Sequence, residues 1–413
     1  MRAGALRRSV RSVAPGRGFD RRVQVSLLVL SGAVLVAVTS EMLPAGLLSV
    51  MADDLGASRS AVGAVISAYA VVVAVAAVPL TILTARWPRR RLLLGCVAGY
   101  GVSNAAMAVS TSMPALIAAR TLGGLTHAVL FSVVTAFAAR LVPDRLMGRA
   151  VSLVLGGSSA AFVLGVPLGT WLGSLLGWRT AFLALAVAAG LLALATPVAL
   201  PALPALPAPA GPSPERPRRA VSGLAMITGF VLLVMLGHST VYTYVSAILL
   251  NAGLAKAAVG PALLVFGAAG LLGIWGSAHL ADRRPRGGLA SFTAVLLLAL
   301  LLLAWATGRT WSTVLVLPLW GAAYAGMPGF FMSAAVRTGC VAPDTCAAVV
   351  NAASNVGIAL GAIGGGLIIT HAGLGTVPLL AAVPVALALT VITVRHRPAD
   401  PQHAPIPSGT RSS

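Results

Sequence analysis

Two full charges lie inside long apolar stretches of this sequence, where a charged side chain is costly. Glu41 is the only charge between Val25 and Met51, and Arg120 lies in a later apolar stretch. His127 follows Arg120 by seven residues, which places both side chains on one face of a helix. A charge at the centre of a bilayer-spanning helix costs about 2.5–3.5 kcal/mol, and such groups are functional by default. These three residues are therefore our candidates for proton coupling.

Three interpretations of Glu41 remain open from the residues alone. A carboxyl group removed from bulk water can load and release protons near neutral pH, so Glu41 could carry protons. It could also be the counter-ion of a cationic cargo, or a static partner of Arg120 that fixes helix packing. The first two interpretations are compatible, since a proton and a cargo that compete for one carboxylate produce antiport. Arg120 could tune this exchange or bond backbone carbonyls, and His127 could relay protons or be a neutral, hydrogen-bonded histidine.

The second half of the chain offers polar and aromatic side chains at helical spacing. Three i, i+4 pairs would each share a helix face: His238 with Tyr242, Trp320 with Tyr324, and Asn351 with Asn355. Together with Glu41 they are our candidates for a substrate cavity, because an aromatic face suits flat, mostly apolar molecules. The alternative is that they only pack and hydrogen-bond between helices.

The elements that must position these residues are membrane-spanning helices. The chain has 413 residues, of which 58% are hydrophobic and 9% charged. Typical soluble domains carry about 25% charged residues, so an integral membrane protein is expected. The apolar runs lack the alternation of barrel strands and are long enough for helices. We predict twelve spans, at 25–50, 61–84, 92–111, 115–139, 150–174, 180–200, 221–249, 258–281, 289–306, 312–336, 347–370 and 376–394.

The basic residues predict the orientation of these spans. Of the 29 arginines and lysines, 24 fall on one side of the predicted membrane. Because basic loops stay in the cytoplasm, both termini and the central linker are expected there, which requires an even number of helices. The net charge of +20 does not indicate nucleic-acid binding, since the arginines lie in short clusters between apolar runs. The three cysteines have no metal-binding spacing, and we expect no metal, cofactor or enzymatic activity.

A proline-rich segment divides the chain into two halves. We predict a basic cytoplasmic tail (1–24), an N-terminal six-helix bundle (25–200), a cytoplasmic linker (201–220), a C-terminal six-helix bundle (221–394) and a disordered cytoplasmic tail (395–413). The halves echo each other, because Pro143-Asp144 recurs as Pro343-Asp344. Two glycines, Gly157 and Gly165, also recur 200 residues later as Gly357 and Gly365. Duplicated halves around a central cavity are typical of transporters.

Four short motifs resemble those of the major facilitator superfamily. "LTARWPRRRLLLG" is similar to the loop motif between its second and third helices, through Arg86, Arg89 and Arg90, and "HLADRRPR" is the second-half copy, with Asp282 and Arg283. "IAARTLGGLTHA" resembles the fourth-helix motif through Arg120 and Gly124, with Gly123 in place of its glutamine. "GVPLGTWLG" resembles the exporter motif of the fifth helix through Gly165, Pro167 and Gly169. "TSEMLPAGLL" resembles the first helix of bacterial chloramphenicol-resistance and arabinose-efflux exporters.

The resemblance implies an all-α membrane protein of two pseudo-symmetric six-helix bundles around a central cavity. In this family the first, fourth, seventh and tenth helices line the cavity, and the arginine loops support gating. It further implies a monomeric, proton-coupled antiporter in the plasma membrane that exports small amphipathic drugs, chloramphenicol-like compounds among them. Its partners would be the small-molecule cargo, protons and the lipid bilayer. The alternatives are sugar or metabolite efflux, and a non-transporting membrane receptor or regulator.

Overall fold

The structure, a computed structural model, describes residues 19–84, 86–202, 218–306, 308–340 and 343–394, which form helices joined by short turns and loops. Twelve helical stretches are long and apolar enough to cross a membrane, so the predicted fold class is confirmed. Most of the predicted tails and linker lies outside the described residues. The helices of the first half are α1 (Arg21–Leu55), α2 (Arg59–Leu83), α3 (Arg89–Val109), α4 (Met113–Arg140), α5 (Asp144–Ala160), η2 (Ala161–Gly165), α6 (Val166–Leu176) and α7 (Trp178–Ala199). Those of the second half are α8 (Arg218–Tyr242), α9 (Val245–Asn251), η3 (Lys256–Ala258), α10 (Val259–Arg283), α11 (Pro285–Trp305), α12 (Thr310–Ala325), α13 (Met327–Arg337), α14 (Pro343–Ala372), η4 (Leu374–Thr376) and α15 (Val377–Val394).

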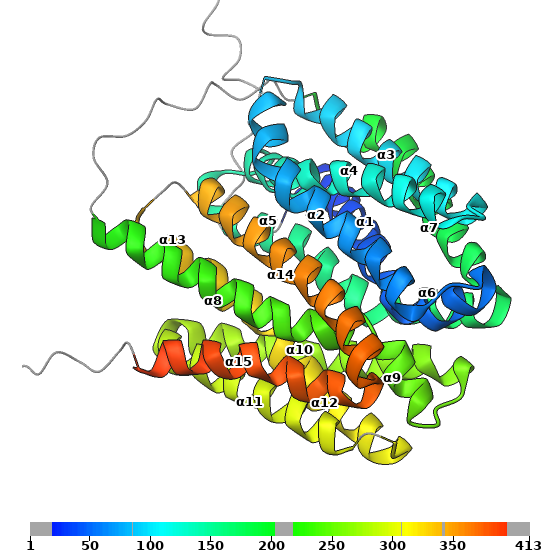
Figure 1. The fold of residues 1–413 in the computed structure, drawn as a ribbon. Helices are drawn as coiled ribbons and strands as arrows, with labels where there is room; N and C mark the ends of the chain where they lie inside the picture. The colour runs from blue at the N-terminus through cyan, green and yellow to red at the C-terminus, as the bar shows by residue number, and fades with distance from the viewer. Residues whose placement is uncertain (1–18, 85, 203–217, 307, 341–342, 395–413) are drawn as a thin grey trace, which may run out of the picture.

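The two halves form separate bundles that meet along two pairs of helices. In Figure 1 helices α1 to α7 occupy the upper part of the molecule, and α8 to α15 the lower part. At the boundary α2 packs along α14, and α10 packs along α6. Each contact joins the second span of one half to the fifth span of the other, so the interface has the same twofold pattern as the sequence repeat. Such an interface allows one half to rock against the other.

Glycines hold the first and fifth spans of each half close together. A Cβ added to Gly157 would collide with Ser31, and one added to Gly165 would collide with Thr39. Gly169 lies in the same way against Leu43. The three pairs have equal separations in the sequence, as expected for two helices that run parallel and pack turn by turn. Small residues permit this close approach in membranes, where van der Waals packing drives helix association.

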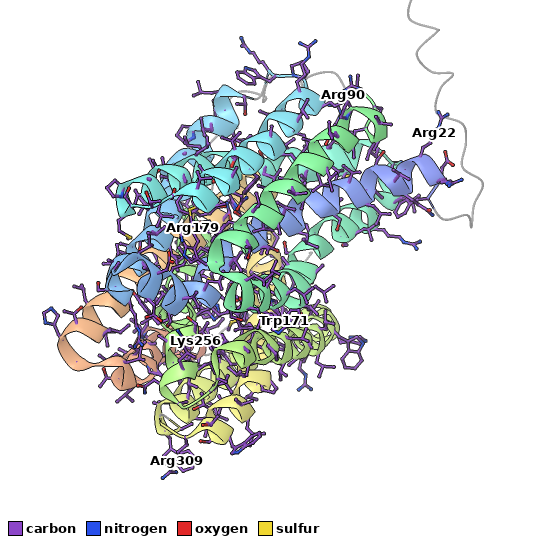
Figure 2. The ribbon with its side chains drawn as sticks, turned by 90° about the vertical axis from the view of Figure 1, so that its right-hand side faces the viewer. Arg22, Arg90, Trp171, Arg179, Lys256 and Arg309 are labelled. Carbon is purple, nitrogen blue, oxygen red and sulfur yellow. The ribbon has the colours of Figure 1, made fainter. Side chains whose placement is uncertain are left out.

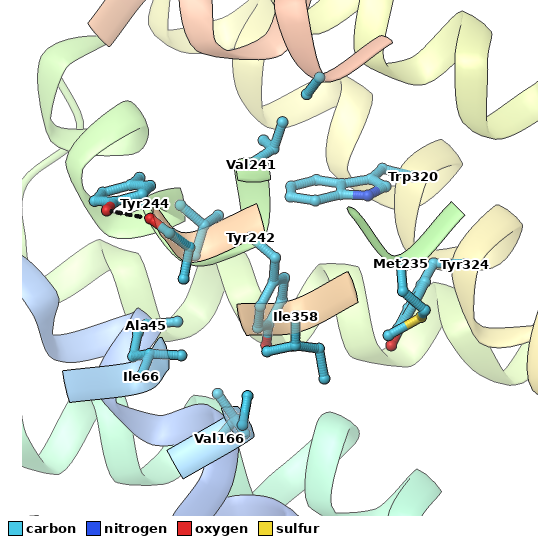
Figure 3. Packing of buried hydrophobic residues seen from close by; sticks show 14 of the residues in the cluster. Ala45, Ile66, Val166, Met235, Val241, Tyr242, Tyr244, Trp320, Tyr324 and Ile358 are labelled. Carbon is cyan, nitrogen blue, oxygen red and sulfur yellow. Dashed lines mark hydrogen bonds between the residues drawn. The ribbon is translucent and has the colours of Figure 1, made fainter. Parts of the chain in front are cut away.

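The second half repeats this packing with the glycines that the sequence repeat singled out. A Cβ at Gly357 would meet Met235 on α8, and one at Gly365 would meet Tyr244 just beyond the end of α8. The first span of this half is broken at that place, between Tyr242 and Val245, whereas the sequence predicted one continuous helix over 221–249. The Tyr244 hydroxyl donates a hydrogen bond to the carbonyl of Ala362 on α14 at 2.8 Å (Figure 3). Tyr244, which lies at the break, thus links the first span of this half to its fifth span.

The fifth span of the first half contains a wide, π-helical turn before its proline. Residues Ala161–Gly165 form this turn, and the next regular segment begins at Val166, with Pro167 in its first turn. Proline lacks a backbone N–H, and its ring clashes with the preceding turn of an α-helix. A π-helical turn absorbs this conflict without ending the span.

The outer surface of the bundle is apolar, as lipid contact requires. Val198 is 89% exposed and Trp311 is 81% exposed. We call the end at which α1 begins the linker end, and the end with the turn from α1 to α2 the far end. Figure 2 shows charged side chains of both ends: Arg22 and Arg90 belong to the linker end, and Arg179, Lys256 and Arg309 to the far end.

Candidate functional site

The site begins with a backbone carbonyl that Pro44 leaves without its usual partner in α1. In a regular helix the carbonyl of Ser40 would accept a hydrogen bond from the N–H of residue 44, which proline does not have. Arg120 of α4 supplies the missing donor, with a hydrogen bond to the carbonyl of Ser40 at 2.7 Å, and it also donates to the carbonyl of Glu41 at 3.0 Å. The guanidinium also lies 4.1 Å from the ring centroid of Tyr69, in a cation–π contact. The hydrogen bonds described for Arg120 thus fix the backbone of α1 rather than the Glu41 carboxylate.

The Glu41 carboxylate faces His127 on the same helix as Arg120. Oε2 of Glu41 lies 3.8 Å from Nε2 of His127, which is too long for a direct hydrogen bond. The other ring nitrogen, Nδ1, lies 2.8 Å from the Tyr69 hydroxyl and 2.9 Å from that of Tyr100. A tyrosine hydroxyl that donates to Nδ1 leaves the ring proton on Nε2, the atom that faces Glu41. Carboxyl, imidazole and two phenols therefore form one polar cluster inside the first half.

Packing around this cluster explains one departure from the fourth-helix motif. Gly123 stands where the family motif has glutamine, and a Cβ there would lie 2.8 Å from the Ser103 hydroxyl and 3.1 Å from the ring of Tyr69. A glutamine side chain has no room beneath that ring. Gly124, which matches the motif, lies against the backbone of Tyr69 in the same way.

Sequence reasoning overlooked several members of the cluster. Tyr69 and Tyr100 are each 1% exposed, and Asn104 accepts a hydrogen bond from the Ser40 hydroxyl at 2.9 Å. A signal was available, since the chain has only five tyrosines and all of them lie in predicted spans. All five are buried in the structure. Buried tyrosines usually have a hydrogen-bond partner, so they mark the polar contacts of the interior.

A central cavity lies between the two halves, and Glu41 forms part of its wall. The cavity encloses about 320 Å³ of space between atoms, and its clear interior is only water-sized. Glu41 is 7% exposed, whereas Arg120 and His127 are 1% and 2% exposed and lie behind it. The lining residues are Glu41, Met42, Ala45 and Ile66 from the first half, and Met235, His238, Ser239, Tyr242, Thr243, Tyr324 and Ile358 from the second.

Aromatic side chains of the second half form the wall opposite Glu41. The rings of His238 and Tyr324 are stacked, with centroids 3.4 Å apart. The indole N–H of Trp320 donates to Nδ1 of His238 at 3.1 Å, so this nitrogen is the acceptor and His238 is neutral with its proton on Nε2. Figure 3 shows Tyr242 beside Ile358, with Trp320 and Tyr324 to the right of this pair. This wall is mostly flat and apolar, with polar edges.

Other predicted site residues lie away from the cavity. Trp320 supports the wall from behind His238, whereas Asn351 and Asn355 hydrogen-bond to each other along α14, outside the cavity lining. The motif glycines Gly165 and Gly169 belong to the contact between the fifth span and α1, whereas the backbone of Pro167 lies against Gly260 of α10.

The predicted gating loops lie at the linker end. Arg86 is exposed and Arg89 is buried, while Arg90 donates to the carbonyls of Pro197 and Leu200 at the end of α7. The backbone of Asp282 and Arg283 belongs to the last turn of α10, and their side chains lie outside the described part of the structure. Among the described residues, no three His, Cys, Asp or Glu side chains group as metal ligands.

Known proteins are similar to this chain in sequence and in fold. It is 34% identical over 367 residues to a Mycobacterium tuberculosis protein named chloramphenicol efflux pump, a match that covers 86% of this chain and 89% of that protein. It is 31% identical over 364 residues to a Mannheimia succiniciproducens protein named probable sugar efflux transporter, covering 88% and 91%. A bacterial homolog of the human lysosomal transporter Spinster has the same fold, with a TM-score of 0.70 at 15% identity over 91% of this chain and 97% of that one. The model of the Major Facilitator Superfamily matches residues 30–339. The chain therefore belongs to the Major Facilitator Superfamily and is a transporter of the membrane rather than an enzyme.

Proposed function

We propose that this protein exports small amphipathic drugs, chloramphenicol-like compounds among them, in exchange for protons. The relative named chloramphenicol efflux pump supports this class of cargo. The observation that carries the proposal is the position of Glu41, a carboxylate of the first half on the wall of a cavity whose opposite wall is the aromatic group of the second half. Export would run across the plasma membrane, with both termini in the cytoplasm and a monomer as the working unit.

In the proposed cycle a proton and the cargo use the Glu41 carboxylate in turn. Cargo that enters from the linker end would bind between the aromatic wall and Glu41 and displace the proton. After the halves rock, a proton from the far end would neutralise Glu41 and help to release the cargo there. Arg120 holds the α1 backbone and keeps a positive charge near the carboxylate throughout. His127 lies within 4 Å of Glu41 and would turn its ring N–H toward the ionised carboxylate, while its other nitrogen accepts from the tyrosine pair.

The proton gradient supplies enough free energy for this exchange. One proton that crosses 100 mV releases about 2.3 kcal/mol. One pH unit adds about 1.4 kcal/mol. At one-to-one coupling the two together sustain a cargo gradient of several hundred-fold, since each 1.4 kcal/mol corresponds to a factor of about ten.

The test compares wild type with Glu41→Gln in inverted vesicles, with chloramphenicol as the probe and Glu41→Asp as the conservative control. We expect wild type to accumulate chloramphenicol when the vesicle interior is acidic. Glu41→Gln should lose this dependence on the pH gradient and still exchange chloramphenicol at equal pH, while Glu41→Asp should keep part of the coupling. Unchanged pH dependence in Glu41→Gln would mean that Glu41 carries no protons.

Sugar efflux is the second candidate, because a relative at 31% identity has that name. Six of the eleven cavity residues can also hydrogen-bond: Glu41, His238, Ser239, Tyr242, Thr243 and Tyr324. The stacked aromatic wall favours a flat, apolar cargo over a sugar. Transport of arabinose but not of chloramphenicol by the wild-type vesicles would support sugar efflux and contradict drug efflux.

A further inference from the structure

A second cavity lies next to the central one, toward the far end of the molecule. It encloses about 210 Å³ of space between atoms and, like the central cavity, spans the contact between the halves. Ser49 of α1, Thr170 and Ser174 of α6, Ser246 of α9 and Lys256 of η3 contribute polar side chains to its wall. We call it the hydroxyl cavity.

Three of its hydroxyl groups have no hydrogen-bond partner within the described part of the chain. They are Oγ of Ser49, Oγ1 of Thr170 and Oγ of Ser246, and these residues are 2%, 0% and 2% exposed. Many other hydroxyls in the spans bond a carbonyl of the preceding helical turn, as Thr240 does with Leu236. A buried polar group without a partner is unfavourable, and a native protein rarely keeps several of them in one place. Their convergence on one cavity therefore points to a ligand that satisfies them together.

The size and chemistry of the cavity identify that ligand as water. The clear space inside is about that of one water molecule, and a buried water typically makes about three hydrogen bonds. An apolar cargo would leave all three hydroxyls unsatisfied. An anion is also a poor fit, because the one cationic lining residue, Lys256, donates to Asp53 at 2.9 Å.

The hydroxyl cavity continues the path that begins at Glu41. On α1 the central cavity is lined by Met42 and Ala45, and the hydroxyl cavity by Gly46 and Ser49 on the following turn. On the second half the lining passes from Thr243 to Ser246 across the break between α8 and α9. Eight residues separate Glu41 from Ser49, a rise of about 12 Å along a helix.

We propose that Ser49, Thr170 and Ser246 hold a water molecule that relays protons between the far end and Glu41. This inference rests on the proposed proton coupling and adds the route by which protons arrive. A hydronium ion at the far end gives its proton to the relay water, which passes a proton on through the water of the central cavity to the Glu41 carboxylate. Each hydroxyl or water on the route accepts one proton and gives up another, so only Glu41 changes its charge.

The charged and titratable groups around the route are consistent with this direction of transfer. Lys256 and Asp53 pair at the mouth of the hydroxyl cavity, one from each half, so that the net charge there is balanced. His238, Tyr242 and Tyr324 face the route within the central cavity, and Arg120 and His127 lie behind Glu41 at its inner end. The pair at the mouth joins the two halves, so the entrance is expected to widen when the halves separate there.

The test follows the protonation of Glu41 without any cargo. Reconstituted protein is exposed to a pH jump, and the carbonyl-stretch infrared band of the Glu41 carboxyl is recorded, assigned by its loss in Glu41→Gln. The variants are Ser49→Ala, Ser246→Ala and the isosteric Thr170→Val. The matched control is Ser174→Ala, which lines the same cavity but whose hydroxyl already donates to the carbonyl of Trp171 at 2.8 Å.

We expect protonation of Glu41 to slow about tenfold in Ser49→Ala/Ser246→Ala, which corresponds to about 1.4 kcal/mol on the barrier, and to keep its wild-type rate in Ser174→Ala. Folding should not suffer, because the substitutions remove hydroxyls that have no hydrogen-bond partner among the described residues; thermal unfolding checks this. An unchanged rate in the double variant and in Thr170→Val, or no titrating Glu41 band in wild type, overturns the relay.

A second measurement separates the relay from the proposed cargo. Exchange of chloramphenicol at equal pH on both sides moves no net protons and should stay within about twofold of wild type in the relay variants. A parallel loss of exchange and of protonation rate would show that the hydroxyls serve cargo binding or packing, which also overturns the relay. Slowed protonation of Glu41 in a protein that moves no chloramphenicol even as wild type would sustain the relay and refute the proposed cargo.

Discussion

The role of Arg120 as a partner of the carbonyl that Pro44 frees can be tested by a double-mutant cycle. Pro44→Ala restores the backbone N–H that bonds the Ser40 carbonyl in a regular helix. Arg120→Met removes the guanidinium and keeps an apolar side chain of similar length. Because the Arg120 bond to Ser40 is short, at 2.7 Å, the two substitutions should interact.

The expected magnitude follows from that one hydrogen bond. A hydrogen bond to a charged group contributes about 1.5–3 kcal/mol, and part of it persists in Pro44→Ala since a carbonyl oxygen has two lone pairs. We therefore expect Arg120→Met to cost about 1–2 kcal/mol less in the Pro44→Ala background than in wild type. The free energy of unfolding can be measured by titration with dodecyl sulfate in mixed micelles, followed by tryptophan fluorescence.

A second proline provides the control for this cycle. Pro79 also lies within a helix, in α2, but the described hydrogen bonds of Arg120 go only to the backbone of α1. Pro79→Ala should therefore show no interaction with Arg120→Met. If Arg120→Met costs the same, within about 0.5 kcal/mol, with and without Pro44, then Arg120 does not serve the freed carbonyl and our account of the α1 backbone is refuted.

Three further predictions concern packing and the interface between the halves. Gly165→Ala should destabilise the protein by about 1–3 kcal/mol, because the new Cβ meets Thr39, and Thr39→Ala should recover part of the loss in thermal unfolding. Tyr244→Phe should cost about 1 kcal/mol, since it removes a buried hydrogen bond; an unchanged melting temperature would show that this bond contributes nothing. Asp53→Asn should leave the unfolding energy nearly unchanged, because the ion pair with Lys256 is more than half exposed. Spin-label distances across the far end should instead show more molecules with separated halves, and the ratio of separated to closed molecules should rise by at most about fivefold. The charge-exchanged variant Asp53→Lys/Lys256→Asp should return this ratio to its wild-type value.

The fold could be predicted from the sequence because its signals are long and repeated. Twelve apolar runs and one proline-rich break give the helices and the two halves. The glycine pair 157 and 165 and its copy at 357 and 365 take equivalent places in the two bundles, against the first span of each half. The signal at Glu41 was its isolation among apolar residues, since such a charge must face the interior.

The partners within the site could not be predicted, because they depend on which turns of different helices meet. Nothing in the sequence connects Pro44 with Arg120, although the proline leaves the Ser40 carbonyl without its helical donor and the arginine donates to that carbonyl. Hydroxyl groups present the same difficulty. A serine or threonine in a span usually bonds its own helix, and only the packed structure shows that Ser49, Thr170 and Ser246 do not.

The parallel glycine contacts between α1 and the fifth span limit how this transporter can work. They pack the helix that carries Glu41 against the fifth span turn by turn, and hydrogen bonds join it to Arg120 of α4, so we expect the acid, the arginine and the histidine to move together as one rigid unit. We therefore expect this unit to keep its internal geometry throughout the transport cycle. The aromatic wall of the second half would move relative to this unit. Each conformational change would then alter the surroundings of the Glu41 carboxylate on the cavity side and leave Arg120 and His127 in place behind it.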